Sequence, residues 1–118
     1  MVRARVDSVE SPDVDLSDPG ANVPEGYLLT FLIGSDEEPS PETFGVEVWT
    51  PNGLRDRLIS EPAVVGRHIL IARSLSPSHA IEFLTATFEQ CEGGTWRDVA
   101  RQLAQIGAWE FDGYEPGE

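Results

Sequence analysis

The sequence predicts an α+β fold, with an antiparallel sheet of about four strands, two C-terminal helices packed on one face and one short helix in a connection. Three observations predict it. Short apolar runs bounded by turn residues fill the first part of the chain, and two stretches with apolar residues at helical spacing fill the last third. The chain has 118 residues, of which 40% are hydrophobic, and this suits one core. We therefore expect a single domain over residues 1–118.

The first strand is expected at residues 2–7, where small apolar residues alternate with charged ones. This alternation is typical of a half-buried strand at a sheet edge, whose outer charges discourage pairing with other chains. Residues 10–26 follow as an acidic loop rich in proline and glycine. The loop is longer than the usual connection, which indicates a functional or mobile segment.

Two apolar segments predict a β-hairpin in the middle of the chain. The run from Tyr27 to Ile33 is almost wholly apolar, which favours a central strand covered on both faces. A charged, proline-bearing loop follows at 36–42, and residues 44–49 then alternate as a second strand. Pro51 has no N–H for the ladder and ends that strand.

A short helix and a further strand are predicted next. Residues 52–59 can form the helix, with Leu54, Leu58 and Ile59 as candidates for its inward side. The apolar run at 68–72 predicts a third long strand.

Both C-terminal helices start at recognisable caps. Ser76 followed by Pro77 starts the first, and Thr95, with Asp98 three residues later, starts the second. Their apolar stripes are Ile81, Leu84, Phe88 and Cys91 in the first helix and Trp96, Val99, Ala100, Leu103 and Ile106 in the second.

The end of the chain is expected to leave the last helix at Gly107, in the left-handed C-cap conformation. The segment from Trp109 to Tyr114 then forms a final short strand or lies extended on the core. Residues 115–118 are expected to be a mobile tail.

The charge balance is strongly acidic, with 21 acids against 8 bases and a net charge of −13. Repulsion from phosphates argues against nucleic acid and anionic membranes as partners. A basic protein partner is favoured, because opposite charge accelerates its approach. No base lies between Arg5 and Arg55, where the acids are Asp7, Glu10, Asp13, Asp15, Asp18, Glu25, Asp36, Glu37, Glu38, Glu42 and Glu47.

The single cysteine, Cys91, excludes an internal disulfide, and we expect it to be a buried helix residue. The N-terminus has no apolar stretch typical of a signal peptide, and no run reaches membrane-spanning length. These features favour the cytoplasm.

No pattern predicts catalysis, a cofactor or a metal site. His68 and His79 are the only histidines and belong to no zinc motif. The acidic run from Asp13 begins like a calcium loop, but Asp18 occupies the position that needs glycine. No nucleophile or phosphate-binding motif occurs.

The aromatic residues receive different predictions. Trp96 lies on a helical stripe and is expected in the core, and Trp109 is expected to be structural because it alternates with acids. Trp49 can be either a core residue or an exposed anchor, since interfaces favour tryptophan. Tyr114 is the best aromatic candidate for an exposed contact.

Four blocks carry a resemblance to a known family: Ser11-Pro12-Asp13, Phe44 to Pro51, Gly66 to Ile71, and Cys91 to Tyr114. Together, in this order, they resemble the immunity protein 8 family of bacterial polymorphic-toxin systems. The resemblance implies a small cytoplasmic, non-enzymatic protein without cofactors. Such a protein binds and neutralises a toxin made by its own cell through stoichiometric, non-covalent occlusion.

The candidate partner-binding residues are acids and aromatics expected at the surface: Asp36, Glu37, Glu38, Glu42, Trp49, Glu110, Asp112 and Tyr114. If the hairpin loop and the tail share one side of the sheet, these acids form one acidic face that steers a basic toxin. An adaptor or subunit of an assembly unrelated to a toxin is the alternative. An enzyme that uses Asp and Glu would need a pocket with convergent carboxylates. The oligomeric state stays open.

Overall fold

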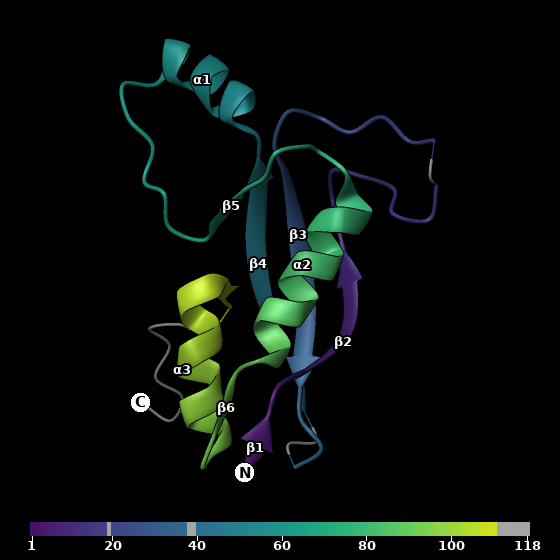
Figure 1. The fold of residues 1–118 in the computed structure, drawn as a ribbon, viewed down its shortest axis with the longest axis vertical. Coiled ribbons are helices and arrows are strands. Elements are labelled where there is room, and N and C mark those ends of the chain that lie inside the picture. The colour runs from purple at the N-terminus through teal and green to yellow at the C-terminus, as the bar shows by residue number, and fades with distance from the viewer. Residues whose placement is uncertain (19, 38–39, 111–118) are drawn as a thin grey trace.

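The computed structural model describes residues 1–18, 20–37 and 40–110. The elements are, in order, β1 (Val2–Arg3), β2 (Arg5–Glu10), β3 (Tyr27–Gly34), β4 (Glu42–Trp49), α1 (Pro51–Ser60), β5 (Ile69–Ile71), α2 (Pro77–Glu89), β6 (Glu92–Gly93), α3 (Trp96–Ile106) and β7 (Ala108–Trp109). Figure 1 shows their arrangement.

The main sheet has the strand order β2-β3-β4-β5. Strands β2, β3 and β4 pair antiparallel, whereas β5 runs parallel to β4. Since β3 occupies one edge of β4, both β5 and β7 pair along the other edge. The predicted α+β class is confirmed, and the parallel β5 makes the sheet mixed.

The first predicted strand is divided in two. Its start, β1, pairs with β6 in a separate two-stranded sheet, and its continuation, β2, forms the edge of the main sheet. Ala4 lies between the two parts and is buried, with its N–H donating to the carbonyl of Cys91. The strand therefore ties the main sheet to the segment between α2 and α3.

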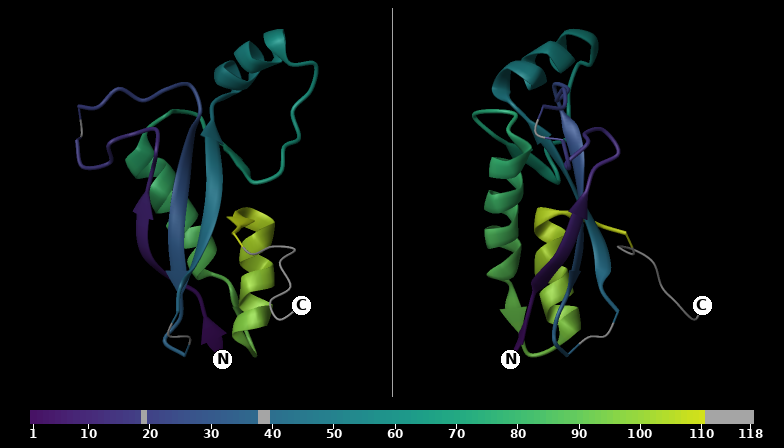
Figure 2. Two further views of the ribbon diagram at one scale, coloured as in Figure 1. Left: turned by 180° about the vertical axis from the view of Figure 1, so that it is seen from behind. Right: turned by 90° about the vertical axis from the view of Figure 1, so that its right-hand side faces the viewer.

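Helices α2 and α3 lie on one face of the sheet, as predicted (Figure 2). The core between the layers contains Phe31, Phe44 and Phe88, all fully buried. The ring centroid of Phe88 lies 5.1 Å from that of Phe31 and 6.4 Å from that of Phe44. These aromatic contacts fasten α2 to the two central strands.

The prediction that both faces of β3 are covered is wrong. Its residues alternate between buried and half-buried from Tyr27 to Leu32. No helix among the described residues covers the second face (Figure 2). The half-buried side chains on that face are Leu28, Thr30 and Leu32, and their neighbours on β2 and β4 shield them in part.

The predicted starts of α2 and α3 are confirmed. The hydroxyl of Ser76 accepts the N–H of His79, and the hydroxyl of Thr95 accepts the N–H of Asp98. Each hydroxyl satisfies an N–H group that has no partner within its helix.

The left-handed conformation predicted at Gly107 is wrong. Its backbone is extended, with φ −124° and ψ 155°. A Cβ there would lie 3.2 Å from Phe44 Cβ and 3.2 Å from Phe88 Cζ. A side chain there would require its neighbours to shift slightly, so close packing, and not a turn, favours glycine at this position.

Two predictions between β4 and α2 are also wrong. In α1, Leu58 is 48% exposed and Ile59 is 82% exposed, so neither faces a core. Strand β5 has three residues and is not long. It begins only at Ile69, because the preceding residue, His68, has a left-handed φ of 61° that does not fit an extended strand.

Candidate protein-binding face

The side of the main sheet opposite α2 and α3 is the candidate site, and we call it the outer face. Alternation along each strand and the register between strands define its members. They are Ser8, Glu10, Leu28, Thr30, Leu32, Thr43, Gly45, Glu47, Trp49, Ile69, Ile71 and Ala108. Small and apolar side chains occupy its centre, and carboxylates lie at its borders.

Two hollows open on the outer face. One has a volume of about 210 Å³ and is lined by Asp13, Leu28, Glu47 and Trp49 among others. The other, of about 340 Å³, is lined by Glu10, Ser11, Pro12 and Thr30. Both are shallow and carry carboxylates at their walls. This shape suits side chains of a protein partner more than a deeply enclosed small molecule.

The segment Ser11-Pro12-Asp13 shapes this region. The Ser11 hydroxyl accepts the N–H groups of Asp13 and Val14 at 3.1 and 3.2 Å, which turns the chain after β2. The Asp13 carboxylate accepts the N–H of Leu28 at 2.8 Å. Val14 is buried and anchors the loop at 10–26 to the core.

Trp49 is held in one orientation, and we call this arrangement the Trp49 platform. Its indole N–H donates to the Glu47 carboxylate at 3.0 Å. The guanidinium carbon of Arg57 lies 5.1 Å from the ring centroid, in cation–π geometry. Gly26, with φ 100°, leaves room for the ring, because a Cβ there would come within 2.6 Å of it. Trp49 is half-buried, so it is neither fully core nor fully exposed.

Arg57 joins α1 to the platform. Its guanidinium pairs with Glu61 at 2.6 Å and with Glu47 at 3.7 Å. The hydrogen bond with Glu61 is the main cause that raises the pKa of Arg57, and the charge of Glu47 adds to it. Glu47 is therefore partly neutralised on the side of α1.

At the opposite end of the sheet lies the hairpin loop between β3 and β4. Asp36 and Glu37 are exposed there. Asp36 pairs with Arg5, which also pairs with Asp7 at 2.8 Å. The hydrogen bond with Asp7 is the first cause that raises the pKa of Arg5. One arginine thus offsets part of the acidic charge at this end.

Glu42 and Glu110 have different surroundings. Glu42 is half-buried and accepts the indole N–H of Trp96 at 2.7 Å, so it bonds to α3. Glu110 is exposed, and its N–H donates to the Thr43 carbonyl at 3.1 Å. Glu110 consequently lies near the hairpin end of β4. Trp96 packs against the core cluster, as predicted.

The structure brings only some of the predicted residues together. Asp36, Glu37 and Glu110 lie toward the hairpin end of β4, whereas Trp49 lies at its other end, roughly 20 Å away at the usual rise per residue. Glu38, Asp112 and Tyr114 lie outside the described residues.

Several outer-face residues belong to the acidic run of the sequence but are not among the predicted partner-binding residues. Glu10 and Glu47 are such residues, Asp13 lines a hollow beside Glu47, and the apolar run predicts Leu28 to be interior. The signal that could have found them is the strand alternation itself. Residues at odd positions in β3 are buried, which leaves those at even positions on the other face.

Trp109 is packed as predicted. Its ring stacks on Phe44 with centroids 6.0 Å apart, and it contacts the core cluster. Cys91 is buried, and this burial raises the pKa of its thiol. The predicted burial is confirmed, but the prediction that Cys91 is a helix residue is wrong, because α2 ends at Glu89.

Within the described ranges, no group of three or more His, Cys, Asp or Glu side chains is placed to hold a metal ion. In the same part of the chain, no helix has the length and apolarity needed to cross a bilayer.

Fold and surface define a small α+β protein whose sheet exposes a broad face bordered by carboxylates. The family model described as Immunity protein 8 matches residues 4–114. The chain therefore belongs to the immunity protein 8 family, which confirms the resemblance noted in the sequence. Comparison with curated proteins and with solved structures finds no match.

Proposed function

We propose that this protein neutralises a cognate bacterial toxin in the cytoplasm of the cell that makes both, by stoichiometric, non-covalent occlusion. Membership of the immunity protein 8 family carries this proposal. The protein acts as a binding partner and not as an enzyme. The hollows of the outer face are shallow, which agrees with recognition of another protein surface.

The outer face is the toxin-binding surface in this proposal, and its toxin is basic. Exposed carboxylates at its borders include Glu10, Glu37, Glu47 and Glu110. Together with a net charge of −13, they attract a basic domain and repel nucleic acid. The Trp49 platform supplies a rigid aromatic contact at one end, with little conformational entropy left to lose.

Co-expression tests the function. The protein would be produced with the C-terminal domain encoded by the neighbouring upstream gene, and growth and co-purification would be measured. The proposal expects a one-to-one complex and restored growth. A toxic domain that neither binds the protein nor is neutralised by it would contradict the proposal, and the adaptor interpretation would then be preferred.

Charge reversal tests the surface. Glu10→Lys, Glu37→Lys and Glu110→Lys would be combined, because these side chains are exposed at the borders of the outer face. Association should slow by about tenfold or more at low salt, and its dependence on salt should weaken. The matched control combines three exposed acids on or beside the helices, Asp56→Lys, Glu82→Lys and Glu92→Lys. Equal slowing in both variants would show that only net charge matters and would remove the outer face as the interface.

A further inference from the structure

The two edges of the main sheet differ in how they are protected. Strand β2, at one edge, has a register irregularity between Val6 and Ser8 and carries the charges of Arg5 and Asp7. The N–H of Val6 donates to the Glu89 carboxylate at 2.9 Å. Bulges, charges and satisfied N–H groups are the usual means of preventing strand addition.

Strand β5, at the other edge, is short but has no bulge, no charge and, among the described residues, no outward N–H group with a recorded partner. It consists of Ile69, Leu70 and Ile71, all apolar, and Ile71 is 61% exposed. It contains no charge, no proline and no register irregularity. An edge of this kind is a template for pairing with another strand.

The backbone of β5 has groups directed away from the sheet. The carbonyl of His68 accepts the N–H of Glu47, and the N–H of Ala72 donates to Trp49. Because backbone groups alternate in direction along a strand, those of Ile69 and Ile71 point to the opposite side. In the described residues, no hydrogen bond is recorded for these outward groups.

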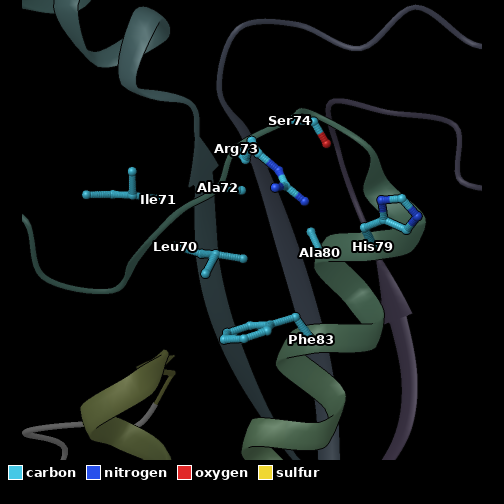
Figure 3. Close-up of a pocket in the computed structure, with 8 residues that line it drawn as sticks. All are labelled: Leu70, Ile71, Ala72, Arg73, Ser74, His79, Ala80 and Phe83. Carbon is cyan, nitrogen blue, oxygen red and sulfur yellow. The ribbon is translucent and has the colours of Figure 1, made fainter.

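Space for side chains lies beside this edge. Figure 3 shows Leu70 and Phe83 directed toward one another, and Ile71 directed away from them. They line a hollow of about 310 Å³. Phe83 also lines a second hollow of about 260 Å³ toward α3. Phe83 is 60% exposed, which is high for a phenylalanine on a helix that packs against the sheet.

Arg73, just after β5, is opposite in sign to the protein as a whole, whereas Glu47 lies across from Ile69 at the start of the strand. Arg73 and His79 line the first hollow and are exposed (Figure 3). A second copy of the chain would carry the same net charge of −13 and would be repelled. Self-pairing is therefore disfavoured, and a segment with carboxylates is favoured.

We propose that the free edge of β5 is a strand-addition site for an extended segment of a partner protein, apolar along its length and acidic at the end near Arg73 and His79. The segment donates to and accepts from the outward backbone groups of Ile69 and Ile71. Alternate side chains of the segment enter the hollows beside Phe83. This site is distinct in chemistry from the acidic borders of the outer face, and it does not depend on the proposed toxin.

A peptide titration followed by NMR tests the proposal. The probe is a capped peptide in which valine alternates with threonine between acidic ends. Saturable shifts are expected for the amide signals of Ile69 and Ile71, together with slower hydrogen exchange at these two positions. Leu70, whose N–H faces β4, should change little in exchange.

Two control peptides separate the contributions. The first has lysine in place of each acidic residue, and the second is N-methylated along the backbone to remove its donors. Both should bind about tenfold more weakly or worse, since one loses charge pairing and the other loses ladder hydrogen bonds. Equal binding by all three peptides, or shifts confined to other surfaces, would overturn the proposal. The absence of saturable shifts with the acidic peptide would overturn it as well.

Matched protein variants locate the site. Ile71→Glu places on the free edge a charge that repels an acidic-ended segment, and Ile59→Glu makes the same change at an exposed position of α1. The first should weaken binding of the acidic-ended peptide about tenfold through charge repulsion and lost edge packing, and the second should leave it unchanged. Similar losses in both variants would show that the peptide does not bind along β5. The dispersion of the amide spectrum checks that both variants remain folded.

Discussion

Replacement of Gly26 by alanine is the sharpest test of the Trp49 platform. The new Cβ would lie 2.6 Å from two carbons of the Trp49 ring, far inside van der Waals contact. The backbone at Gly26 also has φ 100°, which L-residues rarely adopt. We estimate about 1–2 kcal/mol for the backbone strain and about 1–3 kcal/mol for the overpacking. The loss of about 2–5 kcal/mol is large beside the 5–15 kcal/mol of a typical domain.

A double-mutant cycle separates the two contributions. In a Trp49→Leu background the ring atoms that alanine would meet are gone, so Gly26→Ala should cost only the backbone part, about 1–2 kcal/mol. The free energy of unfolding would be measured in urea by far-ultraviolet circular dichroism, because tryptophan fluorescence itself changes in this series. Gly66→Ala is the control, since nothing lies within 4 Å of its Cβ.

The reasoning would be refuted by equal losses of stability in both backgrounds, because Trp49 would then not lie against Gly26. A loss for Gly26→Ala as small as that for Gly66→Ala would refute the positive φ as well.

Four further predictions concern stability. Thr95→Ala should lower the free energy of unfolding by about 1 kcal/mol through loss of the α3 cap, as measured in urea, and a neutral effect would contradict the cap. Phe88→Ala should lower it by about 3–5 kcal/mol, because the ring is fully buried between two other aromatic rings; a loss below that of Thr95→Ala would be inconsistent with this packing. His68→Gly should be more stable than His68→Ala by about 1 kcal/mol. Both variants lose the 2.8 Å hydrogen bond to α3, but only alanine is strained at φ 61°. A more stable alanine variant would exclude the left-handed backbone. Burial raises the pKa of Cys91 and of Tyr27, so the native state retains protons that the unfolded chain releases. The free energy of unfolding should therefore fall as the pH rises above the ordinary pKa of a thiol. Urea midpoints that stay constant across this pH range would contradict this prediction.

Local signals made the two C-terminal helices predictable. The caps at Ser76 and Thr95 are set by neighbouring residues, because a side-chain hydroxyl reaches only the next turn of its own helix. Apolar periodicity then gave the buried stripe, from Leu84 in α2 to Leu103 in α3. The α+β class followed from these elements and from the short apolar runs before them.

Tertiary contacts decided what the sequence could not. Gly107 has the composition of a helix C-cap, yet its extended backbone results from packing between Phe44 and Phe88, which are distant in the chain. Leu54 and Leu58 have the spacing of one helical face, but α1 projects beyond the sheet (Figure 1), and Leu58 and Ile59 are exposed.

The acidic character of the candidate site could be predicted from the sequence, but the residues that share its surface could not. The base-free run from residue 6 to 54 covers most of the outer face, and its acids lie in β2, in β4 and in the loops beside β3, which itself contains none. Which acids share a surface depends on strand register, since a shift of one residue moves a side chain to the other face. Glu42 and Glu47 belong to one strand, but Glu42 bonds to Trp96 on the helix side, while Glu47 lies on the outer face.

The acidic outer face and the apolar edge of β5 meet at Trp49. In the register of β4 and β5, Trp49 is opposite Ile71, so the platform and the exposed isoleucine are neighbours on the same side of the sheet. The hollow beside Trp49 has Asp13, Leu28 and Glu47 in its walls, whereas β5 pairs with β4 on the edge away from β3. A partner that places a basic surface on the outer face can therefore bring an extended segment to β5 without crossing the molecule. Because Gly26 and Arg57 fix the orientation of the ring, Trp49 is pre-organised for contact with a partner that binds the outer face.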